Sequence, residues 1–338
     1  MSLIRNSLLV VITLSVIICV WAYLAFNPAP PAKQAFINGV VLTVDAMDSI
    51  EEAVFIVENR ITQVGSNEQI KLLIDQDTQV TDLQGKTLIP GFIDAHGHFP
   101  GSGLSAVTVD LNSPPIGKVT TIKQALHMLK QKADDTPKGQ WVVGVGYDDT
   151  ALEEGRHFNK QELDSVSEEH PIYVMHISGH MGVGNSQALL LGGVSKESNN
   201  PEGGVIARDE NGDTSGLLLE TAHNPLAALA LNFSFLDSLA ITTSAVADYT
   251  SKGVTTVQNG LASKMHIESL WRASQLGMVP LRVIVWPDEH VGDKLLSREL
   301  DYVDYRSDRF SIGAIKIVAD GSIQGYTGFL NAPYHVQA

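Results

Sequence analysis

Two histidines separated by one residue, His96 and His98, follow an apolar run in this sequence. In an extended strand, side chains two residues apart point to the same face. The two imidazoles would therefore project side by side from a strand end, where they form a natural ligand pair for one divalent metal. Two solvated loop histidines next to Gly97 and Gly101 are the alternative interpretation of the same pattern.

Lys316 lies in another apolar run, which continues to Asp320. Alternation places Lys316, Val318 and Asp320 on one face of a strand. A lysine that faces a protein interior is unfavourable as a bare ammonium, so it needs a partner. An ion pair with Asp320 is one interpretation.

The elements that must position these side chains follow from the hydrophobic periodicity. Residues 251–322 alternate between strand and helix patterns, which is typical of parallel βα units. A helix is expected over Ser263–Leu276, with Gly277 as its C-terminal cap. The expected strands are Leu88–Ala95, Val254–Asn259, Val279–Trp286 and Ser311–Asp320. Four such strands are half of the eight in a closed TIM barrel.

Two other regions carry elements of their own. Residues 34–88 contain short alternating segments that predict a small antiparallel sheet, with a helix over Ser66–Ile74 capped by Ser66. Residues 105–235 are too long for a structureless loop, so we expect an inserted α/β subdomain that covers the mouth of the barrel. Its patterns are helices at 121–132 and 160–166, strands at 141–145 and 172–177, and a hairpin around 209–213.

Composition restricts the class of protein. Of the 338 residues, 44% are hydrophobic and 18% charged, as in a globular protein. With 23 basic and 38 acidic residues, the net charge is −15, which argues against nucleic acid as a partner. The single cysteine, Cys19, rules out an intrachain disulfide framework and a cysteine-based zinc site. No phosphate loop, dinucleotide fingerprint or His-Glu-x-x-His motif occurs.

Residues 8–26 carry no charge and, as a helix rising about 1.5 Å per residue, are long enough to cross a bilayer. A signal-peptide cleavage site needs small residues, and the large side chains of Tyr23 and Phe26 interrupt the obvious candidates. We therefore predict that residues 1–33 form a membrane anchor and linker, with the remaining part outside the cytoplasm. A cleaved signal and a secreted or periplasmic protein are the alternative.

The stretch from Thr87 to His98 resembles the first barrel strand of the amidohydrolase superfamily of metal-dependent hydrolases. The chain is similar in particular to the YtcJ-like branch, amidohydrolase family 3, from about Ala35 to its C-terminus. Further stretches that carry the resemblance are Phe36–Gly39, Ile61–Gly65, Gly146–Asp149, Gly179–His180, Asn185–Leu189, Gly253–Val257 and Lys316–Ser322.

The resemblance implies an α/β fold: the first half of a metal-dependent-hydrolase TIM barrel with an N-terminal partial β-sandwich, an inserted α/β subdomain and an N-terminal transmembrane helix. The partial sandwich would occupy residues 34–88, the barrel strands 89–104 and 236–338, and the insertion 105–235. It also implies a divalent metal, zinc in the first place, as one or two ions held by His96, His98 and Lys316. In this superfamily a strand-four lysine can be carboxylated and bridge two metals, which we favour over the ion pair with Asp320.

Other polar residues are weaker candidates. Asp94 shares the face of the histidines and either bonds one of them or caps a turn. His180 is expected on the substrate side of the inserted region, whereas His176, inside an apolar strand, is expected to be a satisfied core histidine. Tyr147, Asp148 and Glu220 would line the same cleft or be ordinary loop residues.

Two functions remain open. One is a metal-dependent hydrolase that cleaves a carbon–nitrogen bond in an amide-like small molecule; the other is a membrane-tethered binding or scaffold protein that keeps the fold without catalysis. The family also requires two histidines after strands five and six and an aspartate general base after strand eight. Because no residues in the sequence match these, we expect an N-terminal portion of a longer enzyme that is inactive as it stands. Homodimer formation is left open.

Overall fold

A computed structural model describes residues 31–301 and 305–335. The chain divides into two compact units, Met1–Gly91 and Phe92–Ala338. The apolar segment at residues 8–26 lies outside the described residues. Within the described ranges, no single helix is long and apolar enough to span a membrane. One pair of helices, Asn224–Ala230 and Phe235–Ser251, passes that test together, but it is bent by 96°.

Two small sheets form the N-terminal unit, in the orders β5-β4-β1-β6 and β3-β2-β7. The prediction of an antiparallel sheet is wrong in part, because β1 pairs in parallel with β6 and β2 with β7. The chain between β1 and β6 provides the crossover that parallel pairing needs. The strands are β1 (Lys33–Ile37), β2 (Val40–Leu42), β3 (Ile50–Glu51), β4 (Ala53–Val57), β5 (Arg60–Gly65), β6 (Thr78–Asp82) and β7 (Thr87–Leu88).

The helix of this unit, α2, spans Asn67–Lys71 and begins where the sequence predicts. The Ser66 side chain accepts the Gln69 N–H, and the Gln69 side chain accepts the Ser66 N–H, which forms a capping box. The helix ends before the predicted Ile74. Ile70 points into a small core with Ala35, Ala53 and Phe55.

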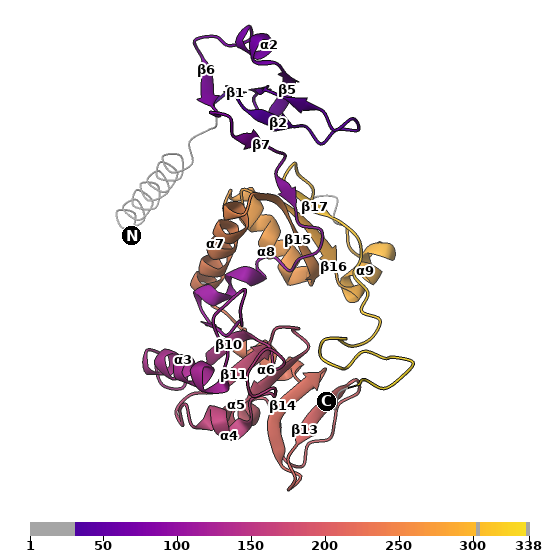
Figure 1. The fold of residues 1–338 in the computed structure, drawn as a ribbon. Coiled ribbons are helices and arrows are strands. Elements are labelled where there is room, and N and C mark those ends of the chain that lie inside the picture. Colours follow the sequence, from indigo (N-terminus) through magenta and orange to yellow (C-terminus); the bar gives the residue numbers. More distant parts are fainter. Residues whose placement is uncertain (1–30, 302–304, 336–338) are drawn as a thin grey trace, which may run out of the picture. The chain divides into compact units, whose positions relative to one another are not determined.

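A parallel four-stranded sheet in the order β17-β16-β15-β8 begins the C-terminal unit. Helices alternate with its strands, so the predicted βα pattern is confirmed, while a closed barrel is not seen among the described residues (Figure 1). Its elements are β8 (Phe92–Ile93), α7 (Phe235–Ser251), β15 (Val254–Ala262), α8 (Lys264–Gln275), β16 (Arg282–Pro287), α9 (Glu289–Leu296) and β17 (Phe310–Ile312).

The fourth strand is much shorter than predicted. Instead of Ser311–Asp320, β17 covers Phe310–Ile312, and residues 313–319 form no regular structure. The Lys316 N–H donates to the carbonyl of Pro287, the last residue of β16, at 2.8 Å, and the chain does not extend the ladder along that strand. Lys316 and Asp320 therefore do not share a strand face.

The stretch between β8 and β15 contains a second, six-stranded sheet in the order β13-β14-β12-β11-β10-β9. Its first three strands in the chain, β9, β10 and β11, are parallel, and the remaining pairs are antiparallel. The elements are η1 (Gly101–Ala106), β9 (Val109–Asp110), α3 (Ile122–Asp134), β10 (Val142–Tyr147), α4 (Lys160–Asp164), β11 (Ile172–His176), β12 (Met181–Gly184), α5 (Ser186–Leu191), β13 (Gly204–Arg208), β14 (Thr214–Glu220) and α6 (Asn224–Ala230).

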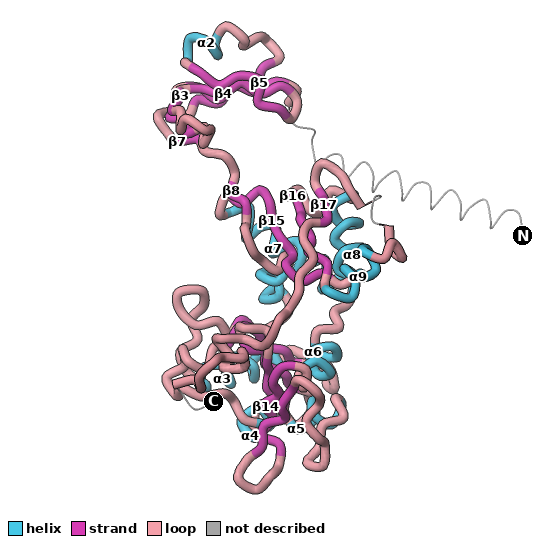
Figure 2. The backbone as a smooth tube through the Cα atoms, turned by 90° about the vertical axis from the view of Figure 1, so that its right-hand side faces the viewer, coloured by secondary structure: helices cyan, strands magenta, loops and turns pink. Residues whose placement is uncertain are grey.

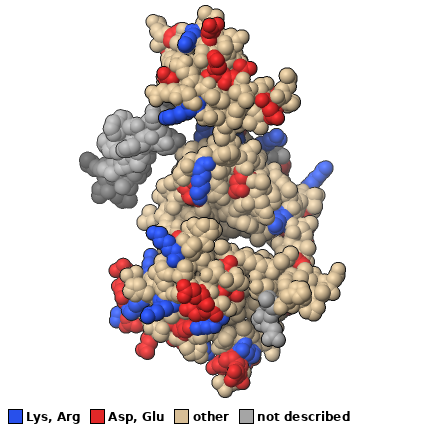
Figure 3. Space-filling view, in the orientation of Figure 1, with Lys and Arg blue, Asp and Glu red and all other residues tan. Residues whose placement is uncertain are grey.

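Every element predicted in this stretch is present, with ends shifted by a few residues. Helix α3 begins after Thr121, whose side chain accepts the Gln124 N–H, and the hairpin β13–β14 turns through residues 209–213. The segment after β17 runs from the parallel sheet toward this six-stranded sheet (Figures 1 and 2). On the face seen in Figure 3, basic side chains of the described residues are scattered among acidic ones rather than gathered into one basic surface.

Candidate functional site

His96 and His98 lie just beyond the C-terminal end of β8, in a loop rather than on the strand itself. The strand stops because the Asp94 carboxylate accepts the His96 N–H through Oδ1, at 3.2 Å, and so forms a local turn. The two rings are still neighbours, with centroids 5.6 Å apart and planes tilted by 49°. The predicted juxtaposition is therefore present, although strand geometry is not its cause.

Backbone contacts with β15 hold this histidine loop in place. The Phe99 N–H donates to the Gln258 carbonyl at 2.9 Å, and the Gly260 N–H donates to the Gly97 carbonyl at 2.7 Å. Gly260 permits close approach, because a Cβ there would lie 3.0 Å from the His96 ring. The His96 ring also stacks on Trp286 of β16, with centroids 5.4 Å apart.

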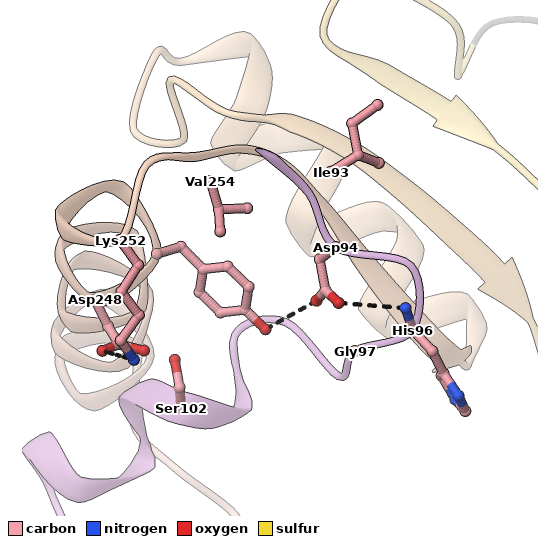
Figure 4. A pocket seen from close by; sticks show the side chains of 9 residues that line it. Ile93, Asp94, His96, Gly97, Ser102, Asp248, Lys252 and Val254 are labelled. Carbon is pink, nitrogen blue, oxygen red and sulfur yellow. Dashed lines mark hydrogen bonds and ion pairs between the residues drawn. The ribbon is translucent and has the colours of Figure 1, made fainter. Parts of the chain in front are cut away.

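Asp94 orients His96 through its backbone and not through its ring. Its second oxygen, Oδ2, accepts a hydrogen bond from the Tyr249 hydroxyl of α7 at 3.2 Å. Burial and the nearby Asp94 charge raise the pKa of Tyr249 to about 12, so the phenol stays protonated at neutral pH. The His96 imidazole points away from the cavity in which Asp94 lies (Figure 4).

That cavity has a volume of about 370 Å³. It contains an ion pair between Lys252 and Asp248 at 2.7 Å. Its lining residues are Ile93, Asp94, His96, Gly97, Ser102, Asp248, Tyr249, Lys252 and Val254.

The surroundings of His98 favour its neutral form, which is the form that binds a metal. Burial lowers the pKa of His98, and the charges of His96 and Lys316 lower it further against the attraction of Asp94. A neutral imidazole offers a lone pair to a cation. Two adjacent imidazoles fit a divalent metal by donor type, whereas the nearby Lys316 would supply a ligand atom only when carboxylated. The assignment of these residues as ligands stays a prediction.

Lys316 lies beside a second hollow of about 460 Å³, together with Asp288, Glu289, His290 and Asp293. Among the described residues Lys316 has no ion pair with Asp320, whose Oδ2 instead accepts the Phe329 N–H at 3.0 Å. The interpretation of Lys316 as the partner of Asp320 is therefore wrong.

His180 and Glu220 come together at one end of the six-stranded sheet. The Nδ1 atom of His180 lies 2.8 Å from Glu220 Oε2, and the Thr327 hydroxyl donates to Glu220 Oε1. Glu220 adopts φ 52°, in the left-handed region, at the end of β14. This contact joins the inserted sheet to the segment that follows Lys316.

A third group of polar side chains lies where β10 and β11 end. His176 Nε2 is 3.1 Å from Asp149 Oδ1 and 3.9 Å from Asp148 Oδ1, and these three residues could hold a metal ion. His157 Nε2 is 3.8 Å from Asp149 Oδ2, and the Tyr147 hydroxyl is 3.1 Å from His157 Nδ1.

The sequence reasoning missed part of this group. His176 is buried as predicted, but it is not satisfied, because its Nε2 forms no hydrogen bond among the described residues. Asp149 and His157 were not candidates at all. The signal that was available is the pair of adjacent aspartates directly after a buried strand, since the carboxyl ends of parallel strands are the common place for ligand sites.

Comparison with known proteins places these observations in a family. The profile described as "Amidohydrolase family" matches residues 79–337. The chain is 33% identical over 267 residues to an N-substituted formamide deformylase of Arthrobacter pascens, covering 78% of this chain and 48% of that protein. It is 28% identical over 313 residues to the putative amidohydrolase YtcJ of Bacillus subtilis, covering 89% and 56%.

A solved structure has a similar fold. The uncharacterized metal-dependent hydrolase of Pyrococcus horikoshii superimposes with a TM-score of 0.65 at 23% identity, covering 89% of this chain and 58% of that one. The chain thus spans about half the length of the curated relatives it matches.

Proposed function

Because the chain belongs to the amidohydrolase family, we propose that the whole protein is a metal-dependent hydrolase that cleaves a carbon–nitrogen bond in an amide-like small molecule. The observation that carries this proposal is the adjacency of the His96 and His98 rings at the carboxyl end of a parallel sheet. In βα folds this end of the sheet is where active sites lie.

Residues of this chain would have the following roles in metal binding. His96 and His98 would hold the metal, with zinc the first choice among first-row ions because two imidazoles suit it. Lys316 would complete the site as a carboxylated ligand. When bound, such a metal polarises a carbonyl group and lowers the pKa of its water to about 7. Asp94 would fix the backbone of His96, and Trp286 would cover one face of its ring.

The substrate class follows from the relatives. One relative is described as an N-substituted formamide deformylase, and N-substituted formamides are therefore the first substrates to test. His180 and Glu220 would contact the substrate from the inserted sheet, since one carboxylate oxygen of Glu220 already orients the His180 ring.

The test compares the whole protein with a His96→Ala/His98→Ala variant. The parent should retain metal after dialysis, measured by mass spectrometry, and hydrolyse an N-substituted formamide; the variant should lose both properties. His127→Ala, on an exposed position of α3, is the matched control and should change neither. Metal retention without turnover on any amide would favour the non-catalytic binding protein. Unchanged metal content in the variant would defeat the ligand assignment.

We also propose that residues 8–26 anchor the protein in a membrane with the hydrolase part outside the cytoplasm, on the strength of their charge-free length. Membrane fractionation of the whole protein tests this. Recovery of the full-length product in the membrane pellet after a carbonate wash supports the anchor, and a soluble product that begins after residue 26 contradicts it.

A further inference from the structure

The cluster at the ends of β10 and β11 does not touch the His96 and His98 site in any contact of the described residues, and it has the composition of a cation site of its own. Asp148 and Asp149 follow β10 directly, and His176 is the last residue of β11. These two strands are parallel neighbours, so their carboxyl ends bring the three side chains to one edge of the sheet.

The spacing of the donor atoms fits a bound ion. A tetrahedral zinc with bonds of about 2.0–2.2 Å keeps its ligand atoms roughly 3.3–3.6 Å apart. The separations from His176 Nε2 to Asp149 Oδ1 and Asp148 Oδ1, 3.1 and 3.9 Å, bracket that range. His157 Nε2 lies 3.8 Å from the other oxygen of Asp149, at the rim of this cluster.

His176 supplies the independent sign that a ligand belongs here. Its side chain is 1% exposed, and its Nε2 has no hydrogen-bond partner in the described structure. Asp149 Oδ1 lies 3.1 Å away as an ion-pair contact that does not have hydrogen-bond geometry. A buried, unpartnered nitrogen aimed between two carboxylates is unfavourable unless a cation or a proton lies there.

In both imidazoles the Nδ1 atom, which is the ring nitrogen not offered to the ion, has a polar partner, as is usual for metal-binding histidines. His176 Nδ1 lies 2.8 Å from the Ser178 hydroxyl and 3.1 Å from the Ser178 N–H, and His157 Nδ1 lies 3.1 Å from the Tyr147 hydroxyl. With the cation bound, Nδ1–H donates to the Ser178 hydroxyl and Nε2 presents its lone pair. Without it, Nδ1 accepts the Ser178 N–H and Nε2 carries the proton.

The charge of the cluster is also uncompensated. Neither Asp148 nor Asp149 has a lysine or arginine partner within 4.0 Å among the described residues; their only ion-pair contacts are to histidines. Burial raises the pKa of Asp149, but the His176 and His157 rings outweigh this and keep it below its usual value. Burial lowers the pKa of His157. Both shifts favour a charged Asp149 carboxylate beside a neutral His157 ring.

We propose that Asp149, His176, His157 and Asp148 bind one first-row divalent cation, separate from the ion expected at His96 and His98. Asp149 and His176 form the inner pair. Asp148 Oδ1 already accepts both donors of Thr150, so Asp148 is the outermost ligand. Its Oδ2 accepts the Gln324 side-chain amide at 3.1 Å, so the ion would steady a contact between the inserted sheet and the segment after Lys316.

The experiment uses the whole protein with His96→Ala/His98→Ala in place, so that the other site cannot contribute. This variant, stripped with a chelator and titrated with Zn²⁺ by calorimetry, should bind close to one equivalent per chain, and its Co²⁺ complex should show visible absorption from nitrogen and oxygen ligands. Adding Asp149→Asn, which keeps the shape but removes the charge, should weaken Zn²⁺ binding by about 100-fold or more, and His176→Gln should do the same.

His170→Gln is the matched control. His170 is buried in the same sheet region but uses Nδ1 on the Gln140 carbonyl, so this change should leave Zn²⁺ affinity unaltered. Absence of Zn²⁺ binding in the His96→Ala/His98→Ala protein, or equal binding after Asp149→Asn, would overturn the proposal. Neither result bears on turnover by the otherwise unaltered protein, so the two metal assignments fail or succeed separately.

Discussion

The Tyr249 hydroxyl connects α7 to the metal-binding candidate His96 through a single carboxylate. Tyr249 donates to Asp94 Oδ2, and Asp94 Oδ1 accepts the His96 N–H, so the position of the imidazole depends on a residue from another element. We expect Tyr249→Phe to weaken metal binding at this site by about tenfold, the usual effect of losing an orienting partner of a ligand. Calorimetric titration of the metal-free whole protein measures it.

Tyr334→Phe serves as the comparison for Tyr249→Phe. It also removes a hydroxyl hydrogen bond, from Tyr334 to the Gly328 carbonyl, but one that does not involve Asp94. It should leave the metal affinity within error of the parent. Equal metal affinities for the parent, Tyr249→Phe and Tyr334→Phe would mean that the hydrogen bond from Tyr249 to Asp94 does not contribute to metal binding.

The pKa of His157 leads to a prediction about stability and pH. Burial lowers this pKa from its ordinary value of 6.5, and the charge of His176 lowers it further, against the attraction of Asp149 and Asp148. Below about pH 6.5 the unfolded chain then binds more protons than the folded one, so stability falls as the pH falls. Melting temperatures between pH 7.5 and 5 should decrease, and less steeply for His157→Gln. A variant with the same slope as the parent would show that His157 is not responsible.

At the residue scale, the sequence predicts a juxtaposition of side chains when they lie in one short stretch. The rings of His96 and His98 are neighbours as predicted, because the two residues are separated by one position, while their role as metal ligands stays a prediction. Asp149, His157 and His176 are distant in sequence, and only the parallel pairing of β10 with β11 brings them together. The exact partner of Asp94 was equally invisible, since Tyr249 lies far along the chain.

At the scale of elements, η1 packs closely against α7 at Gly103, and a single substitution there tests this packing. A Cβ at Gly103 would lie 1.9 Å from the Ile241 carbonyl oxygen and 2.9 Å from the Ala245 nitrogen, both backbone atoms of α7 that cannot turn aside. We expect Gly103→Ala to lower the free energy of unfolding by about 1–3 kcal/mol or more. Denaturant unfolding measures this.

Gly101 provides the control, because it belongs to the same short helix and a Cβ there meets only His98 Cβ at 3.9 Å. Gly101→Ala should be close to neutral. If both variants unfold like the parent, η1 and α7 do not pack as described.

Element boundaries were predictable where a capping residue marks them. Ser263 caps α8 through the His266 N–H, and Thr121 and Asn185 cap their helices in the same way. The alternation from Ser311 to Asp320 was misleading, since the pattern of a strand does not reveal whether a partner is there to extend the ladder. Beyond Ile312 the chain bonds to the end of β16 and leaves the sheet.

At the scale of the whole molecule, the 338-residue chain by itself should associate. Its parallel sheet has β8 and β17 at the edges, and the segment after β17 exposes apolar side chains such as Ile317, Ile323 and Phe329. Unpaired edges and exposed apolar surface promote association. Light scattering after size-exclusion chromatography measures the association. A monodisperse monomer would contradict this prediction.

The most direct measurement is anomalous X-ray diffraction at the zinc edge from crystals of the zinc-loaded whole protein. A bound zinc would appear as a peak whose position identifies its ligands without any assumption about activity. We expect a peak within about 2.0–2.1 Å of one ring nitrogen from each of His96 and His98. Zinc bound elsewhere, with neither imidazole among its ligands, would show that these two histidines do not form the metal site.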